Sequence, residues 1–330
     1  MRVARLYGVG DLRLSDEPPP VATPGHTLVT VTAVGICGSD LHWYAEGGIG
    51  DARLAEAPGL VPGHEMAGVT ADGTLVALDP AAPCHHCDMC RAGHHNLCPN
   101  ISFAGHGTTD GGLCERVAWP VNQLVPLPDG LSAADGAMLE PLGVAVHAMD
   151  LAHPRPGMTV AVAGCGPIGL LLVQLARACG AHYVLAADPL EHRRAAAARY
   201  GADEVHAAVT DGRPPGLGVD IAFEVAGTDD AVEAALTVAR PGARVMLVGI
   251  PETNRTSFPA ALARRKGLTL SLVRRMGDVY PRAAALVSRG TIDVASLVSD
   301  RYPLDRADEA FRQAAARTGL KTIVEPSNPA

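Results

Sequence analysis

Residues 159–188 read TVAVAGCGPIGLLLVQLARACGAHYVLAAD, and this stretch decides the fold of the second half of the chain. Its apolar opening, Thr159–Gly164, predicts a buried strand. The following segment, Ile168–Ala181, has a helical apolar pattern and a glycine near its end. A strand, a glycine-rich turn and a helix in this order predict a unit that binds a dinucleotide.

The turn between strand and helix has the spacing GxGxxG, and each of its three glycines is required for a different structural reason. The first permits a tight turn, the second lets the backbone approach a pyrophosphate, and the third lets helix and strand pack closely. The helix N-terminus then offers free N–H groups to the phosphates. The predicted cofactor-binding residues of the turn are Gly164, Gly166, Pro167, Ile168 and Gly169.

An acidic residue ends the next predicted strand, Tyr183–Asp188, 19 residues after Gly169. A carboxylate at this interval accepts hydrogen bonds from the adenosine ribose and repels a 2′-phosphate, so it favours NAD over NADP. For Arg193, contact with the adenine and simple solvation both remain open. Arg194 weakens the preference for NAD, because a basic pair tolerates a phosphate.

Strands and helices alternate through the rest of this half. Further strands are expected at Val219–Gly227, Ala243–Ile250 and Leu268–Arg274, and helices at Leu190–Ala202 and Asp229–Gly242. This alternation predicts a doubly wound parallel sheet with helices on both faces. Pro156–Ala176 has no charge over 21 residues, but its glycines and Pro167 break it, so we expect no membrane span.

The first third of the chain has a different sequence pattern, with short β-type runs separated by glycine and proline. Strands are expected at His26–Cys37, Leu75–Pro80 and Cys114–Pro120. Many short strands favour a β-rich domain such as a partly open barrel. Two helices, Pro281–Arg289 and Arg306–Thr318, are expected near the C-terminal end.

Composition excludes several classes of protein. The chain has 330 residues, 27 of them Lys or Arg and 35 Asp or Glu, which gives a net charge of −8. With 48% hydrophobic residues it is not a disordered chain, and without a basic block it is not expected to bind nucleic acid. The length favours two domains. No signal peptide is recognisable, so we expect a reducing, cytoplasmic location in which cysteines bind metal rather than form disulfides.

A cluster of four cysteines lies in a 15-residue loop, at Cys84, Cys87, Cys90 and Cys98. Four thiolates in a tetrahedron form a closed site, which is typical of structural zinc. The loop has almost no apolar side chains that could hold it folded otherwise. An iron–sulfur site and unmetallated thiols are the alternatives. Four histidines add further potential ligands: His85, His86, His94 and His95.

A second group of potential metal ligands is spread along the chain. Cys37 lies in GICGSDLHWY, His64 and Glu65 in LVPGHEMAG, and Glu140 in MLEPLGVAVHA. Together they supply a thiolate, an imidazole and two carboxylates. Three or so protein ligands with an open position are what a Lewis-acid zinc requires.

Taken in order, these motifs and the GCGPIG turn resemble those of the zinc-dependent medium-chain dehydrogenases, over essentially the whole chain. The Glu after GH, the EPL motif and HWYAEGGIGD resemble the polyol branch, with sorbitol dehydrogenase and L-idonate 5-dehydrogenase. The resemblance implies a GroES-like β-barrel catalytic domain at residues 1–144 and 276–330, with a zinc lobe at 80–100. It implies a Rossmann NAD-binding domain at residues 145–275.

The resemblance also implies roles for individual residues. Cys37, His64 and Glu65 would hold a catalytic zinc, and Glu140 would be a fourth, exchangeable ligand or would bind the zinc-bound water. Asp40 would orient a ligand. Ser39 and His42 would form a proton relay through the nicotinamide ribose. Substrate contacts are implied for Trp43, Glu140 and Arg275, and a contact with the cofactor phosphates for Arg274. The backbone of Val248, Gly249 and Ile250 would lie along the nicotinamide.

The implied activity is oxidation of a secondary hydroxyl of a polyol or sugar acid by hydride transfer to NAD, with two zinc ions per chain and a tetramer as the expected assembly. A simple alcohol or threonine dehydrogenase is the alternative. A scaffold without catalysis is disfavoured, because no ligand or relay residue is missing. A zinc-ribbon nucleic-acid binder is disfavoured because the cysteine loop has only one arginine, Arg91.

Two segments are shorter than is usual in that family. Residues 68–78 predict a shortened strand pair, and residues 210–220 predict the loss of a surface helix.

Overall fold

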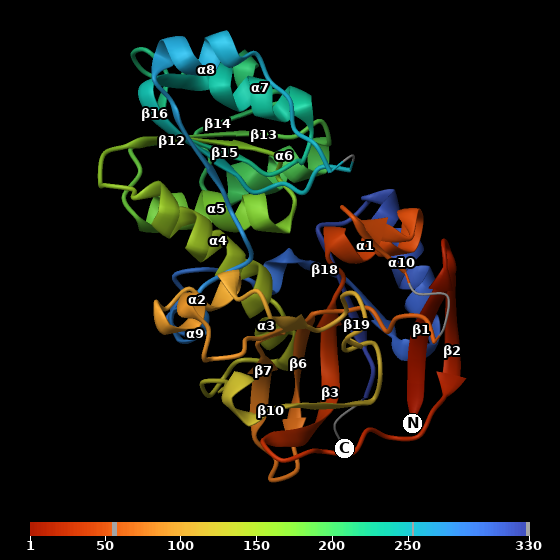
Figure 1. Cartoon of the computed structure of the whole chain (residues 1–330). Helices are drawn as coiled ribbons and strands as arrows, with labels where there is room; N and C mark the ends of the chain where they lie inside the picture. Colours follow the sequence, from red (N-terminus) through yellow and green to blue (C-terminus); the bar gives the residue numbers. More distant parts are fainter. Residues whose placement is uncertain (55–57, 253, 328–330) are drawn as a thin grey trace. The chain divides into compact units, whose positions relative to one another are not determined.

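The computed structural model describes residues 1–54, 58–252 and 254–327. The chain divides into two compact units. The first comprises Met1–Pro141 and Gly277–Ala330, and the second comprises Leu142–Met276. Figure 1 shows the ribbon, coloured along the sequence.

The second unit is built on a six-stranded sheet of order β14-β13-β12-β15-β16-β17, and every neighbouring pair in it is parallel. The strands are β12 (Thr159–Ala163), β13 (Tyr183–Ala187), β14 (Glu204–His206), β15 (Val219–Glu224), β16 (Ala239–Leu247) and β17 (Thr269–Leu272). Every residue of β12 and β13 is buried. Strands buried on both faces require cover on both sides, which is why their sequence is a continuous apolar run.

Helices supply that cover. Helices α5 (Pro167–Ala178) and α6 (Glu191–Arg199) contact each other and β13, whereas α7 (Asp229–Val238) and α8 (Ala260–Lys266) contact each other and β16. In Figure 1, α7 and α8 lie on one side of the strands and α5 on the other. The predicted doubly wound sheet is therefore confirmed.

Some predicted boundaries were wrong. The helix expected over Asp229–Gly242 ends at Val238, and residues 239–242 belong to β16. Pro241 cannot donate a helical hydrogen bond and Gly242 has φ of 76°, so the helix cannot continue there. Helix α8 and strand β14 were not predicted. As expected from the short segment 210–220, only a 3₁₀ turn, Val209–Asp211, lies between β14 and β15.

The first unit is built on a seven-stranded sheet of order β11-β7-β6-β3-β19-β18, with β10 paired to β3. All of its pairs are antiparallel except β18–β19. The strands are β3 (His26–Gly35), β6 (Glu65–Thr70), β7 (Leu75–Leu78), β10 (Arg116–Pro120), β11 (Leu124–Pro126), β18 (Val298–Pro303) and β19 (Lys321–Glu325). Many short strands in one mixed sheet confirm the expected β-rich domain.

Small two-stranded sheets complete the first unit. They pair β1 (Arg2–Gly8) with β2 (Asp11–Asp16), β4 (Gly48–Ile49) with β5 (Ala52–Arg53), and β8 (Ala81–Ala82) with β9 (Ser102–Phe103). The shortened pair β6–β7 turns tightly: Thr70 N donates to Thr74 O at 3.0 Å, and Gly73 has φ of 86°.

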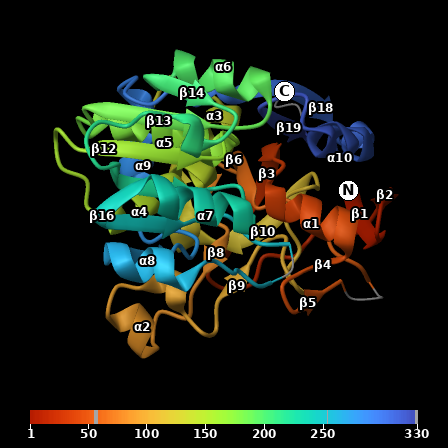
Figure 2. The ribbon, with the colours of Figure 1, turned by 90° about the horizontal axis from the view of Figure 1, so that it is seen from above.

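Five α-helices accompany these strands: α1 (Gly38–Glu46), α2 (Asp88–Arg91), α3 (Ala133–Ala137), α9 (Tyr280–Ser288) and α10 (Ala307–Ala316). Helix α4 (Leu139–Ala152) starts in the first unit and ends in the second. Short 3₁₀ turns lie at His95–Leu97, Val121–Gln123, Ala295–Leu297 and Leu304–Arg306. Figure 2 shows α2 at the edge of the ribbon, where the cysteine loop runs.

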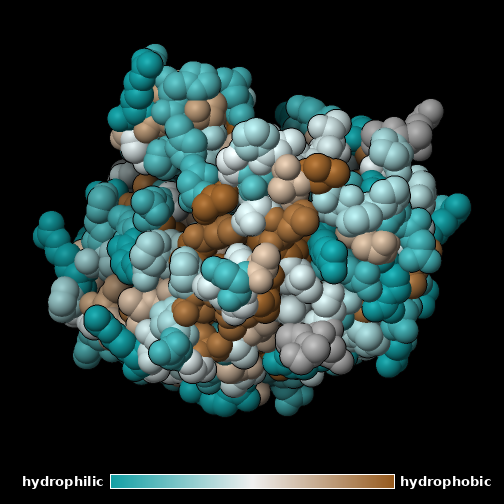
Figure 3. Space-filling model, turned by 90° about the horizontal axis from the view of Figure 1, so that it is seen from below, coloured by the Kyte–Doolittle hydropathy of each residue, from teal (hydrophilic) through white to brown (hydrophobic). Residues whose placement is uncertain are grey.

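Figure 3 shows one face on which hydrophobic residues gather in the middle of a hydrophilic rim. None of the described helices is long and apolar enough to cross a membrane.

Candidate active site

Cys37, His64 and Glu65 come together at the ends of two paired strands. Their potential ligand atoms all lie within 4.8 Å of one another. Strand β3 ends at Gly35 opposite Glu65, the first residue of β6. A Cβ at Gly35 would overlap Glu65 Oε2, so only glycine leaves room for the carboxylate here. The antiparallel register thus joins ligands that are far apart in sequence.

Asp40 binds both segments that carry these ligands. Its Oδ2 accepts a hydrogen bond from Cys37 N at 2.9 Å, and its Oδ1 accepts one from Gly63 N at 3.1 Å. Oδ1 also lies 3.3 Å from His64 Nδ1. Because Nδ1 faces this carboxylate, Nε2 is the ring nitrogen of His64 left for a metal.

The electrostatics of the pair follow from its burial. Burial alone would raise the pKa of the Asp40 carboxyl, but the charge of His64 and the two backbone hydrogen bonds lower it. Burial alone would lower the pKa of His64, but the charges of Asp40 and Cys37 raise it well above its usual value. A cation is therefore favoured between these groups, and a bound metal would take the place of the imidazole proton.

Glu65 has one oxygen committed and one free. Its Oε2 forms an ion pair with Lys321 Nζ, which also donates to Ile36 O at 2.9 Å. Among the described atoms both oxygens are buried without a hydrogen-bond partner, and the ion pair with Lys321 involves Oε2 and not Oε1. A buried carboxylate oxygen without a partner is costly unless a ligand binds it. The donor set Cys37, His64 and Glu65 therefore fits a zinc ion of mixed N, O and S ligands.

Lys321 was missed by the sequence analysis. It opens the apolar strand KTIVE and is 3% exposed. A lysine in a strand that is otherwise buried is rare unless it is paired, and that pattern was the available signal.

Glu140 lies close to the donor set but outside it. It belongs to the first turn of α4 and is 4% exposed. Among the described residues, it is not in the group whose ligand atoms lie within 4.8 Å of one another. Burial raises the pKa of Glu140 to about 7, and the negative charge of Glu65 adds to the shift. Its role as an exchangeable ligand stays a prediction.

The residues of the predicted proton relay lie on α1. Ser39 Oγ is 3.4 Å from His64 Nε2, so it borders the position left for a metal. His42 is one turn further along, and its Nδ1 lies 2.7 Å from Glu46 Oε1. Glu46 was not singled out in the sequence, although its i, i+4 spacing from His42 was visible.

Trp43 lies in the core, with 1% of its surface exposed. Its ring meets that of His106 edge-on at 5.3 Å, and the Phe103 ring lies 5.4 Å from that of His64. These aromatic rings line one side of the donor set. Substrate contact by Trp43 stays a prediction.

The four cysteines of the loop form a separate donor set. The sulfur atoms of Cys84, Cys87, Cys90 and Cys98 all lie within 4.8 Å of one another. Cys87 Sγ and Cys98 Sγ are 3.9 Å apart, close to the roughly 3.8 Å expected of two sulfurs in a zinc tetrahedron. A backbone hydrogen bond from His86 lowers the pKa of Cys84 to about 6, whereas burial raises the pKa of Cys90 to about 12.

The neighbouring histidines make other contacts. His86 Nδ1 lies 2.6 Å from Cys84 O, and His85 Nε2 lies 3.0 Å from Asn122 Nδ2. The rings of His85 and His95 pack against each other at 5.4 Å. None of the histidines belongs to the four-sulfur group that the described residues form.

The glycine-rich turn has the predicted geometry. Gly164 has φ of 105°, which other residues avoid, and Gly166 is the N-cap of α5, with Pro167 as its first residue. A Cβ at Gly169 would overlap Gly164 O, so helix and strand touch through this glycine. Pyrophosphate binding at the N-terminus of α5 stays a prediction.

Asp188 follows β13 and is 5% exposed. Its two oxygens accept hydrogen bonds from Cys165 N and Leu190 N, each at 2.9 Å. Arg193 Nη1 lies 3.9 Å from the carboxylate, and Arg194 Nη1 donates to Asp188 O and Pro189 O at 2.8 Å each. The Arg194 guanidinium is thus held against the backbone at Asp188 and Pro189.

Glu224, at the end of β15, was missed by the sequence analysis. Its Oε1 accepts hydrogen bonds from Ala226 N at 2.7 Å and Gly227 N at 2.6 Å. Its backbone oxygen accepts hydrogen bonds from Val248 N at 2.8 Å and Gly249 N at 3.2 Å. Glu224 therefore ties together the loops that follow β15 and β16. The sequence signal was an acidic residue within the apolar run VDIAFEVAG.

The remaining predicted residues lie in two segments, one directly after β16 and one after β17. Arg275 has φ of 52°, a left-handed backbone conformation that non-glycine residues rarely adopt. Ile250 is 49% exposed and follows Val248 and Gly249. Arg274 lies directly before Arg275, after the end of β17. The substrate and cofactor contacts expected of these residues stay predictions.

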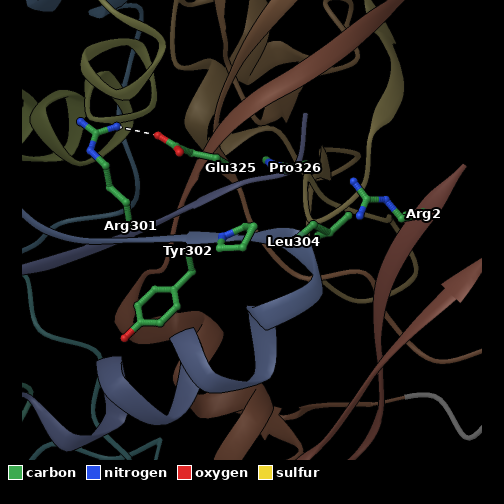
Figure 4. A pocket seen from close by; sticks show the side chains of 7 residues that line it. Arg2, Arg301, Tyr302, Leu304, Glu325 and Pro326 are labelled. Atoms are coloured by element: carbon green, nitrogen blue, oxygen red, sulfur yellow. Dashed lines mark hydrogen bonds and ion pairs between the residues drawn. The ribbon is translucent and has the colours of Figure 1, made fainter. Parts of the chain in front are cut away.

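A surface pocket of about 260 Å³ lies elsewhere in the first unit. Its lining is Arg2, Arg301, Tyr302, Pro303, Leu304, Glu325 and Pro326. Figure 4 shows Arg301 reaching Glu325, at 2.7 Å, and Arg2 pairs with Glu115 at 2.9 Å. The pocket contains no member of either donor set.

Comparison with known families defines the class of protein. The model of the alcohol dehydrogenase GroES-like domain matches residues 23–129, and that of the zinc-binding dehydrogenases matches residues 167–289. Sorbitol dehydrogenase of Bacillus subtilis is 31% identical over 99% of this chain and 98% of the relative. The chain belongs to the zinc-binding dehydrogenase family, and it is an oxidoreductase.

Solved structures agree with this assignment. L-idonate 5-dehydrogenase of Escherichia coli is 28% identical, with a TM-score of 0.91 over 98% of each chain. A zinc-binding dehydrogenase of Sinorhizobium meliloti bound to NADP is 30% identical, with a TM-score of 0.90 over 98% of this chain and 99% of that one. The predicted combination of GroES-like and Rossmann domains is therefore confirmed.

Proposed function

We propose that this protein oxidises a secondary hydroxyl of a polyol or sugar acid to a ketone by hydride transfer to NAD. The observation that carries the proposal is the buried donor set Cys37, His64 and Glu65, in which Glu65 Oε1 has no partner among the described atoms. The substrate class is supported by the sorbitol and L-idonate dehydrogenases among the similar proteins. We assign catalysis to residues 1–144 and 276–330, and NAD binding to residues 145–275.

The two bound groups supply the chemistry that side chains lack. Zinc at Cys37, His64 and Glu65 would act as the Lewis acid that lowers the pKa of the substrate hydroxyl, and NAD would accept the hydride. Asp40 keeps Cys37 and His64 in place through its three contacts.

The chain's own residues handle the proton. Ser39 Oγ borders His64 Nε2 and is placed to accept the hydroxyl proton. With His42 Nδ1 donating to Glu46, its Nε2 is the basic nitrogen that passes the proton to solvent. Trp43, Glu140 and Arg275 are the substrate contacts that we propose from the family resemblance, and an arginine suits a sugar-acid carboxylate.

NAD is proposed as the natural cofactor because Asp188 presents a carboxylate after β13. Arg193, Arg274 and the backbone of residues 248–250 would complete its binding. An Asp188→Ser variant should lower kcat/KM with NAD and raise kcat/KM with NADP, so that the ratio of the two values changes about 10–100-fold. The variant loses the hydrogen bond from the ribose to the carboxylate, and it no longer repels the 2′-phosphate of NADP. Wild-type protein that prefers NADP would contradict the proposal.

The second donor set would hold a structural zinc, which makes two zinc ions per chain. The sulfur spacing supports a tetrahedral ion, and the four-cysteine shell leaves no open position for substrate. Metal analysis of the purified protein should give two zinc equivalents per chain. Iron in place of zinc, or a single equivalent, would contradict this.

We further propose a cytoplasmic enzyme that assembles as a tetramer. The location is supported by eight cysteines, none of which forms a disulfide. The tetramer rests on the family resemblance alone, and sedimentation of the purified protein tests it.

The decisive experiment follows NADH absorbance with NAD and a panel of substrates: L-idonate, sorbitol, xylitol, threonine and ethanol. Preference for L-idonate would indicate an arginine–carboxylate contact, which Arg275→Ala should abolish. Preference for sorbitol or xylitol would indicate a neutral polyol and direct attention to Trp43 and Glu140. Turnover confined to ethanol or threonine would overturn the proposed substrate class.

A further inference from the structure

Lys321 is a buried cation in direct contact with one of the metal-binding side chains. It lies at the start of β19, which pairs with β3 through Ile323 and Gly35. Both side chains of the ion pair are nearly inaccessible, at 2% for Lys321 and 1% for Glu65. Burying two charges is costly, so such a pair persists only where its geometry is fixed by its surroundings.

The surroundings fix the lysine from several sides. Its Nζ donates to Ile36 O at 2.9 Å and faces Glu65 Oε2. The backbone is held by Ile36 N, which donates to Thr322 O at 3.0 Å. A Cβ at Gly35 would lie 2.9 Å from Lys321 Cε, so the missing side chain leaves room for the lysine as well as the carboxylate.

We propose that Lys321 is a positioning residue that holds Glu65 by Oε2 and thereby leaves Oε1 as the single oxygen for zinc. This inference rests on the proposed function, because it concerns the metal of that site. Both carboxylate oxygens are buried without a hydrogen-bond partner among the described atoms, and they differ in that Oε2 forms an ion pair with the Lys321 ammonium. A carboxylate with both oxygens free can bind a metal through either or both; this one is restricted to one.

The lysine also balances charge. Cys37 as thiolate, Glu65 and Asp40 contribute three negative charges within one buried region. A divalent metal neutralises two of them, and Lys321 neutralises the third. Lys321 therefore offsets negative charge that the metal alone would leave in this region, to which Glu140 adds when it is ionised.

The test compares Lys321→Met with Lys321→Arg in the full-length protein. The methionine has nearly the length of lysine without its charge, whereas arginine keeps the charge. Lys266→Met is the matched control, because Lys266 is a lysine whose Nζ donates to the backbone oxygens of Leu236, Thr237 and Ala239. Zinc affinity is measured by chelator competition, and the coordination by the visible spectrum of the cobalt-substituted protein.

We expect Lys321→Met to weaken one of two zinc sites by about 10–100-fold, as is usual when a partner of a metal ligand is lost. Its cobalt spectrum should change, and Lys321→Arg should restore affinity to within about threefold. Lys266→Met should leave both zinc affinities and the spectrum unchanged. A folded Lys321→Met protein with wild-type zinc affinity and cobalt spectrum would overturn the proposal and identify a merely structural ion pair.

If Lys321→Met fails to fold, the zinc affinity of Glu65→Gln is compared with that of the double variant Glu65→Gln/Lys321→Met. The double variant removes both charges of the buried ion pair, so it leaves no uncompensated charge. Because Lys321 acts through Glu65, its loss should cost no zinc affinity once Glu65 is Gln. A further tenfold loss would refute the inference. Wild-type protein that binds only one zinc would instead refute the proposed function, so the two failures are distinguishable.

Discussion

The two donor sets of this protein are built in opposite ways. The four cysteines lie within one loop, Cys84–Cys98, and their partners are mostly backbone groups of the same loop. Cys37, His64 and Glu65 come from separate segments joined by strand pairing, and Asp40 and Lys321 hold them. A set of four identical ligands encloses a metal, whereas a mixed set of three leaves a position open. In the function that we propose, the first set supports structure and the second supports chemistry.

The largest effect should come from the mixed set. Cys37→Ser is expected to lower kcat/KM by about 10³-fold or more, because several kcal/mol of Lewis-acid stabilisation are lost. Thermal stability and NADH binding should change little, since the nucleotide turn lies in the other unit. Cys179→Ser is the control, because Cys179 belongs to neither donor set. Wild-type turnover by Cys37→Ser protein without its metal would break the comparison.

The four-cysteine set should show the reverse pattern. Cys98→Ser is expected to lower the free energy of unfolding by about 4 kcal/mol, because the loop has no apolar core to replace the metal. Limited proteolysis should then cut near Arg91, which is exposed on α2. Activity at low temperature should persist. A Cys98→Ser protein that is stable but inactive would show that the loop serves catalysis.

The Asp40→Asn variant tests the difference between the two donor sets, because Asp40 contacts the segments that carry Cys37 and His64 and not the cysteine loop. Loss of its carboxylate should weaken zinc at the mixed set by about 10–100-fold and leave the other zinc in place. Chelator competition with metal analysis measures both. Equal losses from the two sites would mean that Asp40 supports the fold and not the ligand.

The same residue predicts a dependence of stability on pH. The pKa of Asp40 is lower in the folded protein than its usual value of about 3.9. A lowered folded-state pKa gives stability that is complete above the unfolded pKa and is lost as pH falls through the folded one. Denaturant unfolding should therefore show wild type more stable than Asp40→Asn at neutral pH. The difference should begin to shrink as pH falls below about 4 and should vanish only below the lower, folded-state pKa. A difference that grows on acidification would contradict this sign.

The smallest effect is expected at the loop histidines. His86→Ala should leave the zinc content at its wild-type value, because the structure directs His86 Nδ1 to Cys84 O and not to the sulfur group. A small drop in melting temperature reflects the lost hydrogen bond. Loss of one zinc equivalent would show that a histidine completes this site.

Features that depend on neighbouring residues were predictable. The strand–turn–helix at 159–178 and the four cysteines follow from spacing within one segment, because a turn, a helix cap or a chelating loop is specified locally. The family motifs extended this to Cys37, His64 and Glu65. The helix predicted to extend to Gly242 ends at Val238, and the local signal for this was Pro241, which cannot donate a helical hydrogen bond.

What the sequence by itself determined is the class of protein, its two kinds of domain and the residue types of both donor sets. The tertiary structure alone showed that Lys321 pairs with Glu65 and that Glu224 joins two loops. It also gave the contacts of Asp40 with Cys37 and His64, a role that the family resemblance had implied, and the pairing of His42 with Glu46, whose spacing is visible in the sequence. Lys321 is far from Glu65 in sequence, and only the register of β19 on β3 and of β3 on β6 brings them together. Charge pairing across a sheet depends on that register, which no local pattern of residues specifies.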